Sequence, residues 1–317
     1  MTTNNPLTPF LANNGTLILD GGLASELEYW GYDLNHQLWS AHLLHQQPAA
    51  IRDVHLAYLR AGADCLITAS YQATIAGFMQ MGHSAEYAQH LITRAVTLAQ
   101  EARDMFWREK ANRLGRHRPL IAASIGPYAA YLADGSEYTG LYNQTSQDLF
   151  QFHYDRWHLL ATTEPDIFAC ETIPNRDEAH ALGQLLTTTP HLTAWFSFAC
   201  QDPYHLNDGT PLIDLLPMLN QHPQIVALGV NCTHPRHIPA LIQHLRPHTN
   251  KPIIAYPNSG ETYSSDTKQW SGSGDPNLFG TFSREWRKAG ATIIGGCCRT
   301  RPAHIQQIAD RLRHKPK

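Results

Sequence analysis

The sequence predicts an α/β protein with a (β/α)8 barrel of the TIM type, and three observations point to this fold. Short apolar runs rich in β-branched residues recur along the chain, and helix-like stretches separate them. The runs are almost continuously hydrophobic, as in parallel strands buried on both faces. They number eight, so strand–helix units follow one another around a full barrel. An open, doubly wound sheet is the alternative.

The expected strands are, in chain order, residues 16–20, 64–70, 119–125, 166–171, 193–200, 225–232, 252–257 and 291–297. Between them, residues 48–62 predict a helix, because a proline near the start and a glycine near the end punctuate an amphipathic stretch. Residues 84–110 predict a longer amphipathic helix. No stretch resembles an interdomain linker, so we expect one domain over residues 1–317.

Composition excludes several classes of function. The chain is 43% hydrophobic and 16% charged with a formal net charge of −3, which favours neither nucleic-acid nor membrane binding. The first residues lack a secretory signal and no apolar run is long enough for a membrane span, so we expect a cytoplasmic protein. Six cysteines are too few for a disulfide scaffold, which leaves metal binding or catalysis as reasons for clustering them.

A barrel places its chemistry at the C-terminal ends of its strands. Two long segments, 126–145 and 257–276, follow strands on that side. The residues at the expected strand ends are Asp20, Thr68, Tyr71, Ser124, Gly126, Glu171, Cys200, Asn231, Cys232, Asn258, Cys297 and Cys298. A purely structural role would favour valine and isoleucine at these positions, so we expect a functional site here.

Three cysteines at this end suggest a metal site. Cys232 closes the sixth strand, and Cys297 and Cys298 close the eighth, so one strand separates their positions on the barrel. Three thiolates leave one tetrahedral position open, as in a catalytic zinc site. Gly295 and Gly296 would give the backbone the freedom to present two adjacent ligands. The alternative is that the adjacent cysteines are small buried hydrophobic residues.

The other cysteines have weaker claims. Cys65 starts a strand and Cys170 faces away from its neighbour Glu171, so we assign both to packing. Cys200 ends the fifth strand and stays open as a fourth thiol.

Two carboxylates also stand at strand ends. Asp20 and Glu171 have no evident basic partner, and we expect them to hold a cationic group such as an α-amino group. Gly21 and Gly22 would let a ligand approach the backbone closely. The alternative is that the two acids cap helices.

Taken together, these strand ends resemble a known family. The motifs are LDGG (19–22), ACET (169–172), GVNC (229–232) and GGCC (295–298). They resemble the zinc-dependent homocysteine S-methyltransferases, in order and over essentially the whole chain. Residues 61–74, 124–140 and 256–261 resemble the branch that uses S-methylmethionine as methyl donor.

The resemblance implies one zinc ion per chain, held by Cys232, Cys297 and Cys298. It implies that Asp20 and Glu171 hold the amino group of homocysteine, whose thiolate takes a methyl group from S-methylmethionine or S-adenosylmethionine to form methionine. We assign no general acid or base. Further expected substrate contacts are Gly21, Asn231, Thr68, Tyr71, Ser124 and Tyr128. We expect small-molecule substrates only, and a monomer or weak homo-oligomer.

The chemistry explains these residue types. A free thiol with a pKa near 8.5 is mostly protonated at neutral pH, and zinc ligation deprotonates it. The sulfonium donor is a cation that aromatic faces can hold, and the candidates are Tyr71, Tyr128, Tyr131, Tyr138 and Tyr142. Packing of the loop is an equal explanation for each tyrosine. Two rival functions remain: a non-catalytic zinc or thiol-redox protein, and a metal-free hydrolase that leaves the cysteines unexplained.

Overall fold

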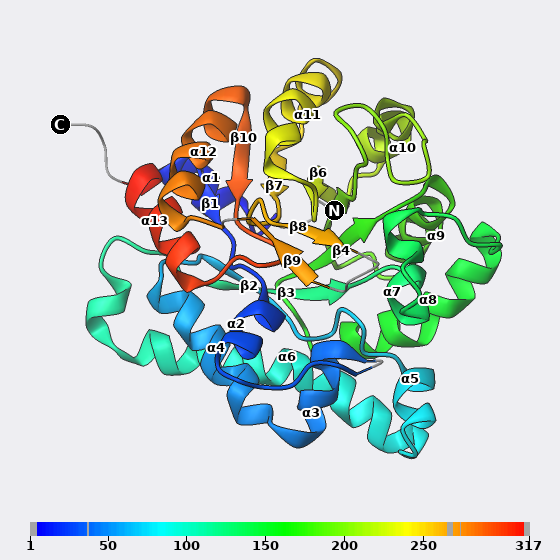
Figure 1. The fold of residues 1–317 in the computed structure, drawn as a ribbon. Coiled ribbons are helices and arrows are strands. Elements are labelled where there is room, and N and C mark those ends of the chain that lie inside the picture. Colours follow the sequence, from blue (N-terminus) through cyan, green and yellow to red (C-terminus); the bar gives the residue numbers. More distant parts are fainter. Residues whose placement is uncertain (1–4, 37, 265–268, 273, 314–317) are drawn as a thin grey trace.

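Eight parallel strands close into a barrel in the computed structural model, which describes residues 5–36, 38–264, 269–272 and 274–313. Their order is β1-β10-β7-β6-β5-β4-β3-β2, and a parallel bridge from Leu19 to Cys65 joins the two ends. Figure 1 shows the strands gathered at the centre with helices around them. The (β/α)8 prediction is confirmed. The open-sheet alternative is wrong, because β1 and β2, the two ends of this strand order, are joined by that bridge.

Each expected strand is present, and most are shorter than predicted. The barrel strands are β1 Leu17–Ile18, β2 Cys65–Ile67, β3 Leu120–Ile125, β4 Ile167–Ile173, β5 Ala194–Phe198, β6 Ile225–Asn231, β7 Ile253–Tyr256 and β10 Ala291–Ile294. The helices that follow them are α4 Pro48–Arg60, α6 Ala85–Arg108, α8 Ser146–Ala161, α9 Arg176–Thr187, α10 Leu216–Gln221, α11 Ile238–Leu245, α12 Pro276–Ala289 and α13 Pro302–Arg313. Among the described helices, none is both long and apolar enough to cross a membrane.

Several of these helices begin at a residue whose side chain accepts a hydrogen bond from a backbone N–H of the first helical turn. Ser84 accepts from the backbone of α6, and Asn175 accepts from the backbone of α9. At α8, Thr145 and Asp148 form a reciprocal capping box. Such caps satisfy backbone donors that have no partner within the helix, and they set the residue at which each helix begins.

The interior of the barrel has its own apolar core, separate from the layer between sheet and helices. Strand residues such as Leu17, Ile167 and Trp195 fill it and are fully buried. Leu7 and Phe10, from the start of the added helix α1 (Thr8–Asn14), belong to the same cluster and so pack against the N-terminal half of the strands. The sequence analysis did not predict α1.

Further additions lie in the connections that follow the strands. The segment after β1 carries α2 (Leu23–Tyr29), η1 (Trp39–His42) and α3 (Leu43–Gln46), and the segment after β2 carries α5 (Ile75–Gln80). The long segment 126–145 contains α7 (Tyr128–Leu132) and η3 (Ser136–Tyr138). In segment 257–276, β8 (Thr262–Ser264) pairs antiparallel with β9 (Gln269–Ser271), and part of this segment lies outside the described residues. Neither long segment is therefore an unstructured loop.

A buried carboxylate supports the junction where the barrel closes. Asp64 lies just before β2, and its Oδ2 accepts a hydrogen bond of 3.1 Å from the Ile18 backbone N–H. Its Oδ1 pairs with Arg313 of α13 and, at 3.5 Å, with Arg116. Arg313 also donates to the Gly62 carbonyl at 2.7 Å, so one network joins β1, β2 and the last helix.

Replacing this carboxylate tests the network. We expect Asp64→Ala to lower the free energy of unfolding by about 2–4 kcal/mol, because it leaves a buried N–H unpaired and removes the partner of two arginines. Urea denaturation followed by circular dichroism measures the change. Asp53→Ala is the control, since the Asp53 side chain is about half exposed and pairs with the adjacent Arg52; it should change stability by less than about 0.5 kcal/mol. Equal effects of the two variants would contradict the assigned role.

Candidate active site

Three cysteine sulfurs converge at the C-terminal ends of β6 and β10. The Sγ atoms of Cys232, Cys297 and Cys298 all lie within 4.8 Å of one another, and those of Cys232 and Cys298 are 3.5 Å apart. Two thiolates on one tetrahedral zinc at 2.3 Å would be about 3.8 Å apart, so the spacing suits a shared metal ion. Among the described residues, this is the group of His, Cys, Asp or Glu side chains that is arranged for a metal.

The remaining cysteines lie elsewhere. Cys65 belongs to the barrel interior and Cys170 to the layer outside the sheet, in keeping with the packing role predicted for both. Cys200 is also buried in the outer layer, where its thiol approaches the Phe198 carbonyl at 3.9 Å. Cys200 is not part of the three-sulfur group, so the open question of a fourth thiol has a negative answer.

Strand β7 lies between the two strands that carry the cysteines and holds them in register. The Cys232 N–H donates to the Tyr256 carbonyl at 3.3 Å, and the Cys297 N–H donates to the Pro257 carbonyl at 2.8 Å. The Ser259 N–H in turn donates to the Cys298 carbonyl at 3.0 Å. Successive residues of one segment therefore fix the backbone of all three cysteines.

Three residues here adopt left-handed backbone conformations without being glycine. They are Thr172, with φ of 60°, Cys232, with φ of 48°, and Arg299, with φ of 64°. Such conformations cost energy for L-residues, and they persist at functional sites when neighbouring contacts enforce them. Fully buried Asn231 enforces one of them: its Oδ1 accepts from the Thr172 N–H at 2.8 Å, and its Nδ2 donates to the Thr172 hydroxyl at 2.7 Å. The same Nδ2 lies 3.9 Å from Cys297 Sγ.

The glycines before the paired cysteines serve a different purpose from the one predicted. Neither Gly295 nor Gly296 has a left-handed φ. A Cβ on Gly295 would lie 2.5 Å from the Leu19 Cβ, and one on Gly296 would lie 2.3 Å from the Thr300 hydroxyl. A Cβ on Gly21 would likewise meet that hydroxyl at 2.7 Å. These glycines allow chain segments to pack closely, so the predicted conformational freedom at 295–296 is wrong, and protein atoms occupy the space beside Gly21.

The proximity of the three thiols changes their acidity. Hydrogen bonds from Cys232 and Cys297 lower the pKa of Cys298 well below its ordinary value, because two S–H groups stabilise one thiolate. The pKa of Cys232 is raised correspondingly, chiefly by its hydrogen bonds with the other two thiols and by burial. The arrangement therefore favours a thiolate at the site even before a metal binds.

Asp20 and Glu171 are both buried beside the sulfurs. The Glu171 carboxylate accepts hydrogen bonds from the Ser124 hydroxyl and, at 3.1 Å, from the Tyr256 hydroxyl. Asp20 Oδ2 accepts from the Ile67 N–H at 2.9 Å, while its Oδ1 is buried without a partner. In the described part of the chain, neither acid forms an ion pair.

This setting makes both acids hard to ionise alone. Burial raises the pKa of Glu171 to about 8, and burial together with the charge of Glu171 raises the pKa of Asp20 well above its usual range. The helix-cap alternative is wrong, because the caps of the following helices are Gly22 and Asn175. Two such carboxylates are suited to a cationic ligand that restores their charged forms.

Two of the predicted contact residues lie behind Glu171. The buried Thr68 hydroxyl accepts from the Ser124 N–H at 3.0 Å, and the buried Ser124 hydroxyl donates to Glu171. They therefore orient this carboxylate. Sequence analysis missed Tyr256, the other donor to Glu171, although it precedes Pro257 at the end of a predicted strand.

The tyrosines separate into two groups. Tyr128 packs against Tyr131, Tyr142 and Phe152 of α8, with ring centroids 4.9–6.0 Å apart, so its surroundings belong to the outer layer. Tyr71 lies near the sulfurs: its pKa is raised by burial and by the charges of nearby groups that include Cys232 and Glu171. The structure therefore favours Tyr71 over Tyr128 as an aromatic residue of the site.

A buried polar network joins the loops after β2 and β3 to helices α8 and α9. Glu178 Oε1 accepts from the Tyr128 N–H at 2.6 Å and pairs with His153 at 2.7 Å, and its Oε2 accepts from the Tyr142 hydroxyl. His153 contacts Arg156 at 2.8 Å, and Arg156 donates to the carbonyls of Tyr71 and Gly126. Sequence analysis named Tyr128 and Tyr142 but did not predict their contacts with Glu178, because nothing in the sequence marks Glu178, His153 and Arg156 as partners.

Comparison with known proteins agrees with this site. The family model for homocysteine S-methyltransferase matches residues 17–312. The chain belongs to the homocysteine S-methyltransferase family. It is 50% identical to a Bacillus subtilis homocysteine S-methyltransferase, YbgG, over 96% of this chain and 97% of that protein. It is 46% identical to an Escherichia coli homocysteine S-methyltransferase over 98% of this chain and all of that protein.

Solved structures of a relative show the same fold. The metallated form of the Escherichia coli homocysteine methyltransferase MmuM superposes with a TM-score of 0.87 at 45% identity, over 97% of this chain and 100% of that one. Its oxidised form gives a TM-score of 0.88 at 44% identity, with the same coverage of both chains. As a member of this family, the chain is a methyltransferase that acts on homocysteine.

The role of Asn231 in a homocysteine S-methyltransferase site can be tested by an isosteric change. We expect Asn231→Asp to weaken binding of a metal ion by the three cysteines about 10–100-fold, because it keeps the acceptor for the Thr172 N–H but replaces the donor to Cys297 with a negative oxygen. Competition with a chromophoric chelator measures the affinity. Asn112→Asp is the control, because Asn112 lies in the η2 turn (Lys110–Arg113), outside the three-sulfur group. This change should leave the metal affinity unchanged. Equal affinities of the wild type and Asn231→Asp would contradict this role.

Proposed function

We propose that this chain transfers a methyl group from a sulfonium donor, S-methylmethionine or S-adenosylmethionine, to the thiolate of L-homocysteine and so forms methionine. One observation carries the proposal: three converging cysteine sulfurs lie beside two buried carboxylates that have no cationic partner among the described residues. The sulfurs suit a metal and through it a thiol, and the carboxylates suit an ammonium group. Homocysteine has both groups.

Zinc is the metal that best fits the three sulfur donors, Cys232, Cys297 and Cys298. Three cysteine ligands leave one position of a tetrahedral site for an outside ligand. When bound, the metal would lower the pKa of the homocysteine thiol and keep its sulfur anionic at neutral pH. Three thiolates make the site electron-rich, which preserves the nucleophilicity of that sulfur.

The buried acids would orient the acceptor. Asp20 Oδ1 has an unused acceptor position, and the two Glu171 oxygens are held in place by Ser124 and Tyr256. An ammonium group between these acids would compensate for their burial, since an unpaired charge is costly in a poorly solvated site. The amino acid would then be fixed at one end by charge and at the other by its sulfur.

The transfer itself needs no proton donor or acceptor from the protein. The thiolate attacks the methyl carbon, the carbon–sulfur bond of the sulfonium breaks, and the leaving sulfur keeps the electron pair as a neutral thioether. The charges of nucleophile and donor cancel, so alignment and exclusion of water are the main contributions of the protein. Tyr71 would present an aromatic face to the cationic sulfur.

A methionine-formation assay tests the proposal. The zinc-loaded protein with homocysteine and either sulfonium should produce methionine, and a chelator should abolish activity that added zinc restores. Cys298→Ser should lose both zinc and activity, whereas Cys170→Ser, outside the three-sulfur group, should retain both. The proposal would be wrong if the zinc-loaded protein formed no methionine from either donor.

The contribution of Glu171 can be separated from that of the metal. We expect Glu171→Gln to raise the KM for homocysteine about 10–100-fold, because a charge-assisted hydrogen bond to the ammonium group is lost. Zinc content and the KM for the donor should stay close to the wild-type values. Steady-state kinetics with each substrate varied in turn measures this, and an unchanged KM for homocysteine would count against the assigned role.

A further inference from the structure

We propose that Arg299, with Glu28 and Glu261 beside it, forms a subsite for the amino-acid end of the methyl donor. The guanidinium group would bind the α-carboxylate, and the flanking carboxylates would attract the α-ammonium group. This inference rests on the proposed function, and it adds the part of the donor that the chain recognises besides the sulfonium.

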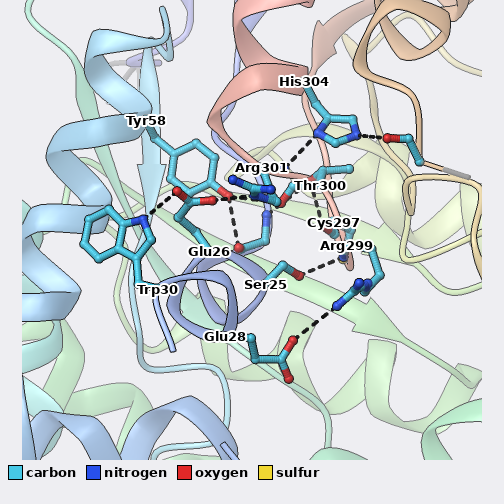
Figure 2. Close-up of polar contacts among 12 residues, drawn as sticks. Ser25, Glu26, Glu28, Trp30, Tyr58, Cys297, Arg299, Thr300, Arg301 and His304 are labelled. Atoms are coloured by element: carbon cyan, nitrogen blue, oxygen red, sulfur yellow. Dashed lines mark hydrogen bonds and ion pairs between the residues drawn. The ribbon is translucent and has the colours of Figure 1, made fainter. Parts of the chain in front are cut away.

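The position of Arg299 is set by the metal-ligand segment. It directly follows Cys298, has a φ of 64°, and its N–H donates to the Ser25 hydroxyl of α2 at 2.8 Å. Figure 2 shows its side chain reaching toward Glu28. The left-handed backbone at Arg299 therefore goes with a side chain that points toward Glu28 of α2, directly after Cys298.

The charge of Arg299 is only loosely satisfied. Its Nε and Nη2 lie 3.3 and 3.4 Å from the Glu261 oxygens, and its Nη1 lies 3.5 Å from Glu28 Oε2. These distances exceed those of strong charge-assisted bonds, which are about 2.7–2.9 Å. The side chain also remains 35% exposed. A carboxylate ligand could therefore engage the guanidinium group without first breaking a strong internal pair.

Arg301, two residues later in the same segment, forms a tighter ion pair than Arg299 and has a structural role. Its Nε lies 2.9 Å from Glu26 Oε2, and the side chain of Glu26 is only 6% exposed. Glu26 also accepts from the Trp30 indole at 2.8 Å, and the Arg301 guanidinium stacks on the Tyr29 ring. In Figure 2 Arg301 points toward Glu26 while Arg299 points toward Glu28. Arg301 thus holds the segment after Cys298 against α2 through its ion pair with Glu26. The side chain of Arg299 is not needed for this attachment.

The two sides of the sulfur group have different surroundings. Cys297 lies on the side of the buried acids, because the N–H of the preceding Gly296 donates to the Asp20 carbonyl at 3.0 Å. Cys298 directly precedes Arg299, and its carbonyl accepts from Ser259, whose hydroxyl donates to Glu261 at 2.9 Å. The proposed acceptor site lies on the Cys297 side and Arg299 on the Cys298 side, which leaves the sulfur group between the two amino acids.

The chemistry matches a zwitterionic donor. S-methylmethionine and S-adenosylmethionine both carry an α-carboxylate and an α-ammonium group, and the planar guanidinium group binds carboxylates through paired hydrogen bonds. The subsite therefore recognises what the two donors share. It selects an amino-acid sulfonium over one that lacks the carboxylate charge.

The experiment compares S-methylmethionine with its carboxamide, which keeps the sulfonium and ammonium groups. We expect Arg299→Gln to lower kcat/KM for S-methylmethionine about 10–100-fold, because a bidentate contact to a charged group is lost. The value for the carboxamide should change less than about twofold, and so should the KM for homocysteine. Arg299→Lys should recover part of the lost efficiency. Should the carboxamide prove too slow a donor, its inhibition constant against S-methylmethionine gives the same comparison.

Arg301→Gln is the matched control. It should lower kcat/KM for S-methylmethionine and for its carboxamide by the same factor, through zinc content or stability. The reason is that Arg301 holds the segment after Cys298 against α2. The subsite is overturned when Arg299→Gln lowers kcat/KM for both donors by the same factor, as the loss of a structural residue would. It is also overturned when the variant raises the KM for homocysteine instead. Absence of transfer by the zinc-loaded wild type from either sulfonium would overturn the proposed function and the subsite with it, and this result differs from a selective loss in the variant.

Discussion

The convergence of three cysteine sulfurs on one point is the constraint that organises this end of the barrel. Cys232 and the pair Cys297–Cys298 come from strands separated by β7, and the segment that leaves β7 bonds to the backbone of all three. Bringing adjacent ligands to one point costs left-handed conformations at Cys232 and Arg299. The closed sheet behind them is what allows that strain to persist, since its register leaves the strand ends few other positions.

The same closed sheet creates the surroundings of the two carboxylates. Asp20 and Glu171 lie at the ends of β1 and β4, where both are buried, and the charge of Glu171 helps to raise the pKa of Asp20. Their hydrogen bonds come from Ser124, Tyr256 and the Ile67 backbone, which are neutral donors. Neutral donors fix the geometry of a carboxylate without neutralising it. The site thereby keeps its demand for a positive charge, which an ion pair with arginine or lysine would have removed.

The features predicted from sequence are those that depend on local pattern. Continuous apolar runs identified every barrel strand, and strand-end positions brought together Cys232, Cys297 and Cys298. Features that depend on distant neighbours were missed or misread. The glycines at 295 and 296 avoid Leu19 and Thr300, contacts that no local pattern contains. The roles of Thr68 and Ser124 likewise depend on which strands become neighbours, and helix α1 and the β8–β9 hairpin arise where the apolar pattern is weak.

The network around Glu178 shows why few tyrosines are free to contact a substrate. One buried carboxylate and one buried guanidinium satisfy three backbone groups in the two loops after β2 and β3, so those loops are held together as a unit. The Tyr142 hydroxyl is committed to Glu178, and the Tyr128 ring to the aromatic group over α8. Arg156 holds the Tyr71 carbonyl instead, which anchors the backbone of that residue while its side chain lies on the sulfur side. A rigid support of this kind suits methyl transfer, because a displacement along one line depends on alignment more than on acid–base groups.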